Sequence, residues 1–372
     1  MHFHRIVVGV DFTEASLAAV HWVATHFAPD AEIVLAHVIA EPRVPSFLRS
    51  HLPPAREVTE AVAPALFGGL RGLSEMIGKD RARVEVVSGN AAEGLAQVAD
   101  RVGADLVCVG RGRRRRGSAR FGATTAQRLL SRTRIPTLVV PAVRLKSPER
   151  IVVAIDERPG DRHVLEVASG LAAALEARVD ALHVVEPEVL TFLSASVPAD
   201  AWADRPRRSG GARPTEAASP SFTNDGVQPR WVHDRARQWI DGMLDALRSR
   251  ASRMDPAVAS GDAGQEIIRH VRQHESDLVV VGRGGDASLA TTPLGALPLG
   301  STARLVLWVA PCPVLVVPLD ASRRVQPPPS DWERRRRLGV EPIPLRAVRA
   351  ERSEPLPPAA HRRSGMAEDG AA

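Results

Sequence analysis

The sequence predicts a tandem pair of α/β domains, each a doubly wound, three-layer α/β/α sandwich built on a five-stranded parallel sheet. Three observations lead to this prediction. At 372 residues the chain is too long for one ordinary domain. Its first half recurs, in the same order, in its second half. Aromatic residues make up only 4% of the chain and Tyr is absent, so the cores must be aliphatic, which suits parallel strands buried on both faces.

The internal repeat sets the domain organisation. The opening apolar segment 5–11 returns at 150–156, and the last one, 136–141, returns at 313–318. Segments between them return in order as well: His37-Val38 at His183-Val184, Ser88-Gly89 at Ser260-Gly261, and 107–110 at 279–282. The offset grows from 145 to 177, so the copies differ by insertions. We place the first copy at residues 1–145 and the second copy at residues 149–320.

Short apolar strands alternate with helical patterns in each copy, as in βαβ units of a parallel sheet. In the first copy the expected strands are 5–10, 32–38, 83–88, 105–109 and 137–140. A helix is expected behind Thr13, a residue type that caps helix N-termini. Apolar residues recur there at helical spacing, at Leu17, Val20, Ala24 and Phe27, and in the second copy at Val164, Val167, Leu171 and Leu175.

Two segments fall outside this pattern. Residues 199–230, rich in Pro, Ser, Gly and Arg, interrupt the second copy and predict a mobile loop, after which helical periodicity resumes over 231–247. The tail, residues 321–372, is rich in Arg and Pro and is expected to be disordered.

The charge distribution argues against a nucleic-acid-binding body. The chain carries a net charge of +6, but the tail contributes +4 (11 Arg against 7 Asp and Glu) and residues 111–116 add five Arg. Without both segments about −3 is left. Specific nucleic-acid binding is not expected, since aromatic stacking residues are absent from the Arg-rich loop. That loop could hold a polyanion electrostatically.

Cysteine use and hydropathy favour a cytoplasmic protein without a membrane segment. Cys108 and Cys312 form neither a disulfide framework nor a CxxC metal motif. Asp11 follows the first apolar stretch at once, which does not fit a signal peptide. The longest apolar run, 305–319, is broken by prolines and is too short to span a bilayer.

Residues suited to nucleotide binding follow the predicted strands, where ligands bind in open parallel sheets. Asp11 and Asp156 end the first strands, and a carboxylate there can accept hydrogen bonds from a nucleoside. In the second copy Gly282-Arg-Gly-Gly285 follows the fourth strand, and Gly300-Ser301 opens the last helix. Glycines allow close approach of backbone to phosphate, and N–H groups at a helix start donate to its oxygens.

This arrangement resembles the universal stress protein family, whose ATP-binding members use Gly-2x-Gly-9x-Gly-Ser/Thr after the fourth strand. The resemblance covers both copies, about 260 residues, and implies an adenine nucleotide alpha hydrolase-like fold. It implies ATP, with Mg²⁺, as the ligand. By this resemblance Asp156 would contact the nucleoside, the backbone of Val184 the base, and Gly282, Gly285, Gly300 and Ser301 the phosphates.

Both copies depart from the family pattern, the first more strongly. In the second copy fourteen residues, not nine, separate Gly285 from Gly300. In the first copy Asp11, Val38 and Gly110 match, but Arg113 replaces the second glycine, and Gly122-Ala-Thr124 replaces the Gly-Ser pair. A side chain at position 113 opposes close backbone approach, so weaker or altered binding is expected there.

No catalytic motif supports an enzyme, although slow ATP hydrolysis is compatible with the sequence. Walker A, GxSxG and HExxH patterns are absent from the sequence, and no general base or arginine finger is found. His270 and His274 share a helix face and could pair on a metal, but without further ligands a solvated face is the expected interpretation, so no metal site is predicted. His37 and His183 are expected to be structural.

Two functional hypotheses follow. The first is an ATP-binding regulator of the stress response. The second is an ATP-independent scaffold whose inserted loop and tail recruit an unknown protein partner. In both, the two copies form an internal pseudo-dimer, and the chain could also form a homodimer. An ATP-consuming ligase or pyrophosphatase of related fold is disfavoured, because a Ser-Gly-Gly-x-Asp-Ser type loop is missing after the first strand.

Overall fold

The computed structural model describes residues 3–27, 31–40, 55–78, 81–112, 124–143, 146–188, 230–247, 253–284 and 299–319. Three predicted motif residues lie outside these ranges: Arg113, Gly122 and Gly285. So do the predicted tail and the predicted loop over 199–230, apart from Arg230, which opens a helix.

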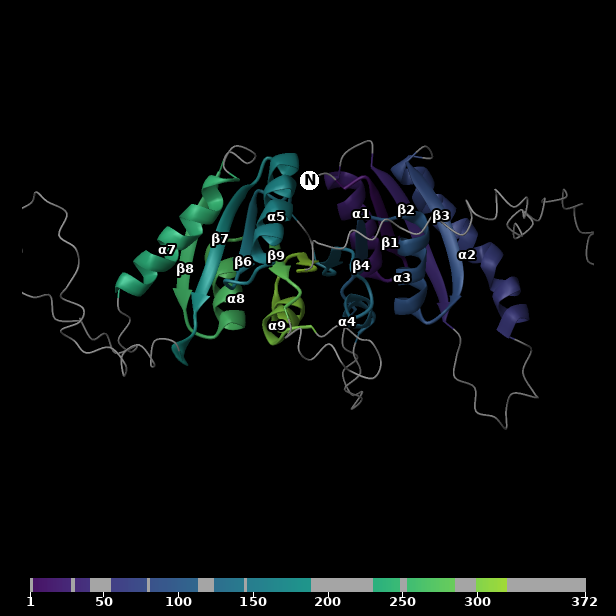
Figure 1. Cartoon of the computed structure of the whole chain (residues 1–372). Coiled ribbons are helices and arrows are strands. Elements are labelled where there is room, and N and C mark those ends of the chain that lie inside the picture. The colour runs from purple at the N-terminus through teal and green to yellow at the C-terminus, as the bar shows by residue number, and fades with distance from the viewer. Residues whose placement is uncertain are drawn as a thin grey trace, which may run out of the picture. The chain divides into compact units, whose positions relative to one another are not determined.

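The strands of both copies form one ten-stranded sheet (Figure 1). Its order is β3-β2-β1-β4-β5-β10-β9-β6-β7-β8. The strands are β1 (Arg5–Gly9), β2 (Glu32–Ala40), β3 (Ala82–Gly89), β4 (Leu106–Gly110), β5 (Thr137–Val140), β6 (Arg150–Ile155), β7 (Arg178–Val185), β8 (Met254–Ser260), β9 (Leu278–Gly282) and β10 (Val314–Val317). Each copy therefore has the doubly wound order 3-2-1-4-5, with parallel pairing throughout. The predicted fold class is confirmed, and the five strands predicted in the first copy agree with the structure to within two residues at either end.

The two parallel sheets meet at an antiparallel junction between β5 and β10. Leu138 pairs with Leu315, and these two residues are equivalent in the repeat, because both lie second in their strands. The pairing thus relates the copies by a pseudo-twofold axis at this point, which is the internal pseudo-dimer that the repeat predicts.

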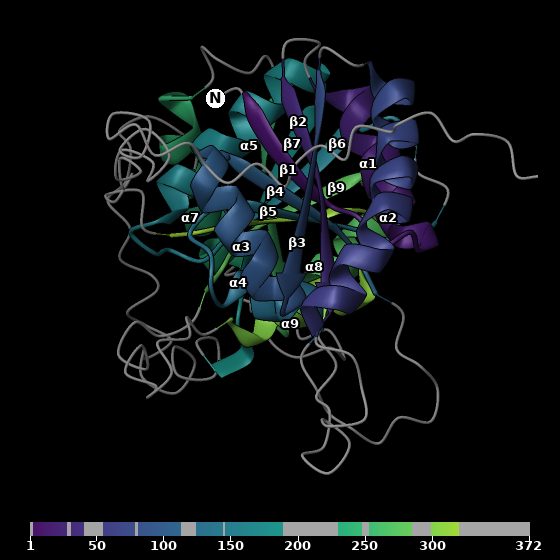
Figure 2. The same ribbon diagram turned by 90° about the vertical axis from the view of Figure 1, so that its right-hand side faces the viewer.

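Helices cover both faces of the sheet, and Figure 2 shows them on either side of the strands. They are α1 (Glu14–His26), α2 (Ala55–Ile77), α3 (Ala91–Val102), α4 (Thr125–Leu130), α5 (Asp161–Leu175), α7 (Arg230–Asp245), α8 (Ala263–Gln273) and α9 (Ser301–Val309). The core against α1, α2, α5 and α7 is one continuous cluster of buried apolar residues that runs through both copies. A second cluster fills the space against α3, α4, α8 and α9.

The first helix begins as predicted and buries Val20, but Leu17 lies outside the core. The Thr13 side chain accepts a hydrogen bond from the Ser16 N–H and so caps α1. Leu17, expected in the core, is 38% exposed. The first turn presents small residues, Ala15 and Ser16, because a Cβ built on Gly110 would lie only 2.5 Å from the backbone of Ala15. The helix comes too close to β4 there for a large side chain to fit. Further along the helix the large side chains of Val20, Trp22 and Val23 are buried.

Two arginines join the copies reciprocally. Arg111 donates from Nη1 to the carbonyl oxygens of Leu307 (3.4 Å) and Ala310 (2.6 Å), at the end of α9. Arg283, at the equivalent place in the second copy, donates from Nη1 to Leu130 (3.2 Å) and Thr133 (2.7 Å), at the end of α4. A cation at a helix C-terminus is favourable because carbonyl groups there lack intrahelical donors. Arg111, expected as part of a polyanion-binding cluster, is therefore a contact between the copies.

Both cysteines are free and buried. Burial raises the pKa of the Cys108 thiol far above its ordinary value and that of Cys312 to about 12. Within the described ranges, the helices are all too short or too polar to cross a membrane.

Candidate functional site

The predicted site residues of the second copy lie where its strand order reverses. β6 lies between β7 and β9, and Ala154 of β6 pairs with Val281 of β9, so Asp156 and Gly282 end neighbouring strands. Asp11 and Gly110 end β1 and β4 in the same way in the first copy. Open α/β sheets bind their ligands at this point, beyond the carboxyl ends of the strands.

The loop after β6 holds the Asp156 carboxylate in a fixed and open position. The Asp156 side chain is 67% exposed and forms an ion pair with Arg158, with Nε and Oδ2 separated by 3.0 Å. Glu157, the next residue, has a φ of 54°, in the left-handed region that side chains rarely adopt. Phe12 follows Asp11 with a φ of 59°, so the first copy has the same unusual turn. Backbone strain of this kind concentrates at functional sites.

A buried carboxylate supports this loop from below. Asp161 is 3% exposed, and its Oδ2 accepts hydrogen bonds from the backbone N–H groups of Asp156 (2.8 Å) and Arg158 (2.9 Å). Burial raises the pKa of Asp161, although these two bonds oppose the rise. Ser16 has this place in the first copy and accepts from the Asp11 N–H at 3.3 Å.

Asp11 itself is held in a different way from Asp156. Its Oδ1 accepts hydrogen bonds from the Thr13 hydroxyl (2.6 Å) and the Thr13 backbone N–H (3.1 Å). Burial raises the pKa of Asp11, but the hydrogen bonds from Thr13 and Ser16 outweigh it and hold the pKa below its ordinary value. The Asp11 oxygen is thus already engaged with its own loop.

Val184 lies one residue beyond the end of β6. His183 pairs with Ile155, the last residue of β6, so the β6 ladder ends just before Val184. In the first copy Gly9, the last residue of β1, pairs with Ala36, so Val38 likewise lies beyond the end of β1. The neighbouring histidines are structural, as predicted: Nδ1 of His183 lies 3.1 Å from the Ile155 carbonyl oxygen, and Nδ1 of His37 lies 2.6 Å from that of Val10.

Gly110 is required by packing, and Gly282 lies close to a neighbouring side chain. A Cβ on Gly282 would lie 2.7 Å from the Leu319 side chain, and one on Gly110 would meet the start of α1. Gly110 therefore needs glycine even without a bound phosphate, whereas at Gly282 the end of the flexible Leu319 side chain can move aside. The packing role of Gly110 was not predicted from the sequence.

The start of α9 is open toward a glycine turn. Gly300 is the N-cap residue of α9 and provides no side-chain hydrogen bond to the helix. Gly284, with a φ of 59°, lies against it: a Cβ on Gly284 would be 3.5 Å from the Gly300 Cα. The Gly300 N–H donates to the Arg283 carbonyl at 3.1 Å and so ties the turn to the helix. Ser301, the first helical residue, is exposed. The phosphate motif predicted from the sequence did not include Gly284.

The start of α4 in the first copy is closed instead. Thr124 caps it with a full capping box: its hydroxyl accepts from the Gln127 N–H at 3.3 Å, and its own N–H donates to the Gln127 side chain at 3.1 Å. Thr124, predicted as a weak phosphate contact, satisfies its own helix. The described residues of the two predicted sites therefore lie in equivalent places, but only in the second copy does the last helix start without a side-chain cap.

Comparison with known families gives one decisive match. The model of the universal stress protein family matches residues 2–141 and again residues 148–318. The chain belongs to the universal stress protein family. Both universal stress protein domains include their candidate strand-end positions, and the tandem arrangement inferred from the repeat agrees with the two matches. A search of the curated proteins returned no match.

Solved universal stress proteins share the fold of this chain. One from Archaeoglobus fulgidus is 14% identical and aligns over 85% of this chain and 98% of its own length, with a TM-score of 0.56. A putative one from Pseudomonas aeruginosa is also 14% identical, over 85% and 93% of the two chains, with a TM-score of 0.52. A universal stress protein solved in complex with cAMP aligns over 47% of this chain at 16% identity, with a TM-score of 0.29.

Proposed function

We propose that this universal stress protein binds ATP, with Mg²⁺ on its phosphates, in its second copy, and that it acts as a regulator of the stress response and not as an enzyme. The open N-terminus of α9 beside the Gly284 turn is the observation that carries this proposal. Following the family pattern, Asp156 would contact the nucleoside, the Val184 backbone the base, and Gly282, Gly285, Gly300 and Ser301 the phosphates.

The physical basis is the anion affinity of a helix start. The first N–H groups of a helix have no intrahelical acceptor, and the helix dipole places partial positive charge there. A phosphate can accept from these groups where no side chain already does so. At α9 a glycine stands in the cap position, whereas at α4 the Thr124 capping box already satisfies the helix start. We therefore expect one nucleotide per chain.

The test is nucleotide binding to matched charge variants, measured by calorimetry or equilibrium dialysis. Ser301→Glu places a carboxylate at the first helical residue of α9, where it favours the helix but repels phosphate. We expect at least about tenfold weaker ATP binding, which corresponds to about 1.4 kcal/mol. Gly300→Val should weaken binding as well, because it adds bulk at the cap. The φ of Gly300 is −58°, which valine can adopt, so the fold should persist.

Thr125→Glu is the matched control, since Thr125 is the first helical residue of α4 and is likewise exposed. It should leave both affinity and stoichiometry unchanged. Equal losses in Ser301→Glu and Thr125→Glu would contradict a site specific to the second copy. Absence of ATP binding by the unchanged protein at millimolar concentration would reject the proposal.

The scaffold function is the second candidate, favoured by the β5–β10 junction, which lets the first copy serve as a structural partner of the second. It would replace the nucleotide proposal if no binding were measured. A protein partner and a cytoplasmic location remain predictions from the sequence, and two free buried thiols are compatible with a reducing compartment.

A further inference from the structure

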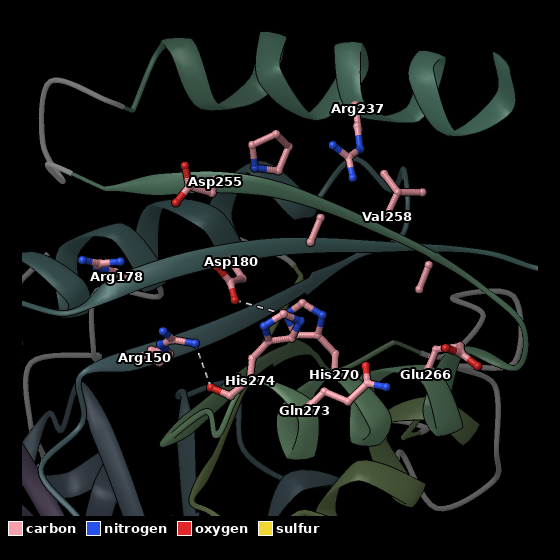
Figure 3. Close-up of a pocket in the computed structure, with 13 residues that line it drawn as sticks. Arg150, Arg178, Asp180, Arg237, Asp255, Val258, Glu266, His270, Gln273 and His274 are labelled. Carbon is pink, nitrogen blue, oxygen red and sulfur yellow. Dashed lines mark hydrogen bonds and ion pairs between the residues drawn. The ribbon is translucent and has the colours of Figure 1, made fainter. Parts of the chain in front are cut away.

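A second group of chemically active side chains lies near the opposite edge of the second copy. Asp180 is the third residue of β7, close to the start of the strand, whereas Val184 lies near its end. His270 lies on the last turn of α8 and His274 is its C-cap residue, and α8 packs beneath β7 (Figure 3). Together they line a pocket of about 440 Å³. The group is therefore separate from the predicted nucleotide site, and the nucleotide proposal does not use it.

The three side chains are already close to a metal-binding geometry. Nε2 of His270 lies 3.1 Å from Oδ2 of Asp180, and the two imidazole rings have centroids 4.1 Å apart. One ligand atom from each of the three residues can be chosen so that all lie within 4.8 Å of one another. In a tetrahedral zinc site with bonds of about 2.0–2.2 Å, ligand atoms are about 3.3–3.5 Å apart. Small side-chain rotations would suffice to reach that arrangement.

Neighbouring residues restrict the positions of the three side chains, and the adjoining pocket has space for a further ligand. The side chains of His270 and Asp180 are only 12% and 25% exposed, so their positions are restricted. Arg150 donates from Nη1 to the His274 carbonyl oxygen at 3.0 Å and fixes the end of α8. The pocket that these residues line offers space for a water molecule as a further ligand. Asp255 and Glu266 line this pocket together with Arg178 and Arg237, so its charges are mixed in sign.

In the first copy the positions equivalent to Asp180, His270 and His274 hold apolar residues. The caps of α3 and α8, Asn90 and Asp262, are 172 residues apart, so His270 and His274 correspond to Val98 and Val102. Pairing with the third strand places Val34 opposite Arg83 and Asp180 opposite Asp255, also 172 residues apart, so Asp180 corresponds to Val34. Val34 and Val98 are buried core residues, and Val102 packs against the same cluster.

Three valines in one copy thus correspond to three metal-ligand residue types in the other, on two different elements. The fold does not need polar residues there, since the valine cluster serves the same packing role. Burying polar groups carries a cost that a hydrophobic cluster avoids. A bound ion would give the second copy a reason to keep all three.

We propose that Asp180, His270 and His274 form a binding site for a divalent transition-metal ion, zinc being the metal that suits this donor set. Two imidazoles and one carboxylate are a recurring zinc ligand set, with water in the fourth position. The i, i+4 spacing places both imidazoles on one face of α8, and β7 supplies the third ligand from above (Figure 3).

The test uses Co²⁺ alone as a spectroscopic probe on the full chain, followed by displacement with Zn²⁺. The unchanged protein should give the visible absorption of four-coordinate Co²⁺ at one ion per chain, and Zn²⁺ should abolish it. The triple variant Asp180→Val, His270→Val, His274→Val copies the first domain and should fold. It should lose the absorption, and its Zn²⁺ affinity should fall by more than the 10–100-fold that loss of a supporting contact causes.

Two kinds of controls keep the result interpretable. His21→Val removes an exposed histidine on α1 and should bind Co²⁺ as the unchanged protein does. His270→Gln and Asp180→Asn keep polar side chains but remove a ligand, so they should lose binding even if the valine variants misfold. Unchanged ATP binding by these variants would separate the metal site from the nucleotide site. The proposal would be overturned if the folded triple variant still bound Co²⁺, or if the unchanged protein did not bind it.

Discussion

Gly110 shows how a single missing side chain fixes the position of a helix. A Cβ there would lie 2.5 Å from Ala15 C and from Ser16 N, both backbone atoms that cannot rotate away. The same close approach explains why the first turn of α1 has the small residues Ala15 and Ser16 facing the sheet. A glycine that sequence motifs assign to ligand binding can thus be required by packing alone.

We predict that Gly110→Ala destabilises the protein by about 2–4 kcal/mol, because α1 must move away from β4 and its core contacts loosen. Gly72→Ala is the matched control: Gly72 lies within α2, and a Cβ there would meet nothing within 4 Å. That change should be neutral or stabilising by up to about 1 kcal/mol. The free energy of unfolding from urea titration measures both, and similar values for the two variants would disprove the packing explanation.

At the scale of elements, the ends of helices differ between the copies more than their bodies do. The start of α4 is capped by its own side chains and that of α9 is not, while the ends of both receive an arginine from the opposite copy. The helix ends therefore carry one asymmetry between the copies and, besides the β5–β10 pairing, a second contact that joins them.

The arginine contacts yield a prediction about stability. Arg283→Met should lower the free energy of unfolding by about 1.5–3 kcal/mol, the range for hydrogen bonds to charged groups, and Arg111→Met should have a similar effect. Arg71→Met should change it by less than about 0.5 kcal/mol, since Arg71 is 77% exposed and pairs only across one helix turn with Glu75. If all three variants unfolded at the same urea concentration, the arginines would not join the copies energetically.

The elements of the fold could be predicted from sequence because each pattern occurs twice. The strand boundaries at 5–9 and 137–140 follow from apolar runs that recur in the second copy. The junction of β5 with β10 could not be read, because no local pattern encodes pairing between distant strands. The capping role of Thr124 was missed because Thr124 was assigned to the phosphate motif. The sequence did contain the signal of a capping box, which is Gln127 three residues later.

The Asp180–His270–His274 group shows the same limit at the level of a site. The two histidines are visible as an i, i+4 pair, but Asp180 lies 90 residues from His270 and is brought there only by the sheet. An alignment of the two copies would have revealed this group, because three valines of the first copy align with Asp180, His270 and His274 of the second.

At the scale of the whole molecule, the two copies share one core. The apolar cluster against α1 and α5 is continuous through Leu138 and Leu315, the pair at the centre of the junction. Unfolding one copy would expose apolar surface of the other.

We therefore predict a single cooperative unfolding transition, in which hydrogen-exchange protection of β1 and β6 is lost together. Leu138→Asp buries a carboxylate at the centre of the junction, where Leu138 is 1% exposed, and should separate the transition into two. Val143→Asp, at a 48% exposed position just beyond β5, should leave it single. Two transitions in the unchanged protein would show that the copies fold independently.

The β5–β10 junction lies within one polypeptide, so mutations affect its two sides independently. In a pair of identical subunits every mutation appears on both sides, and the pair separates on dilution. Here a mutation alters one side only, and the partner stays at a high effective concentration whatever the amount of protein. The first copy can therefore keep its valine cluster and the capped start of α4, while the second copy acquires two histidines and the uncapped start of α9.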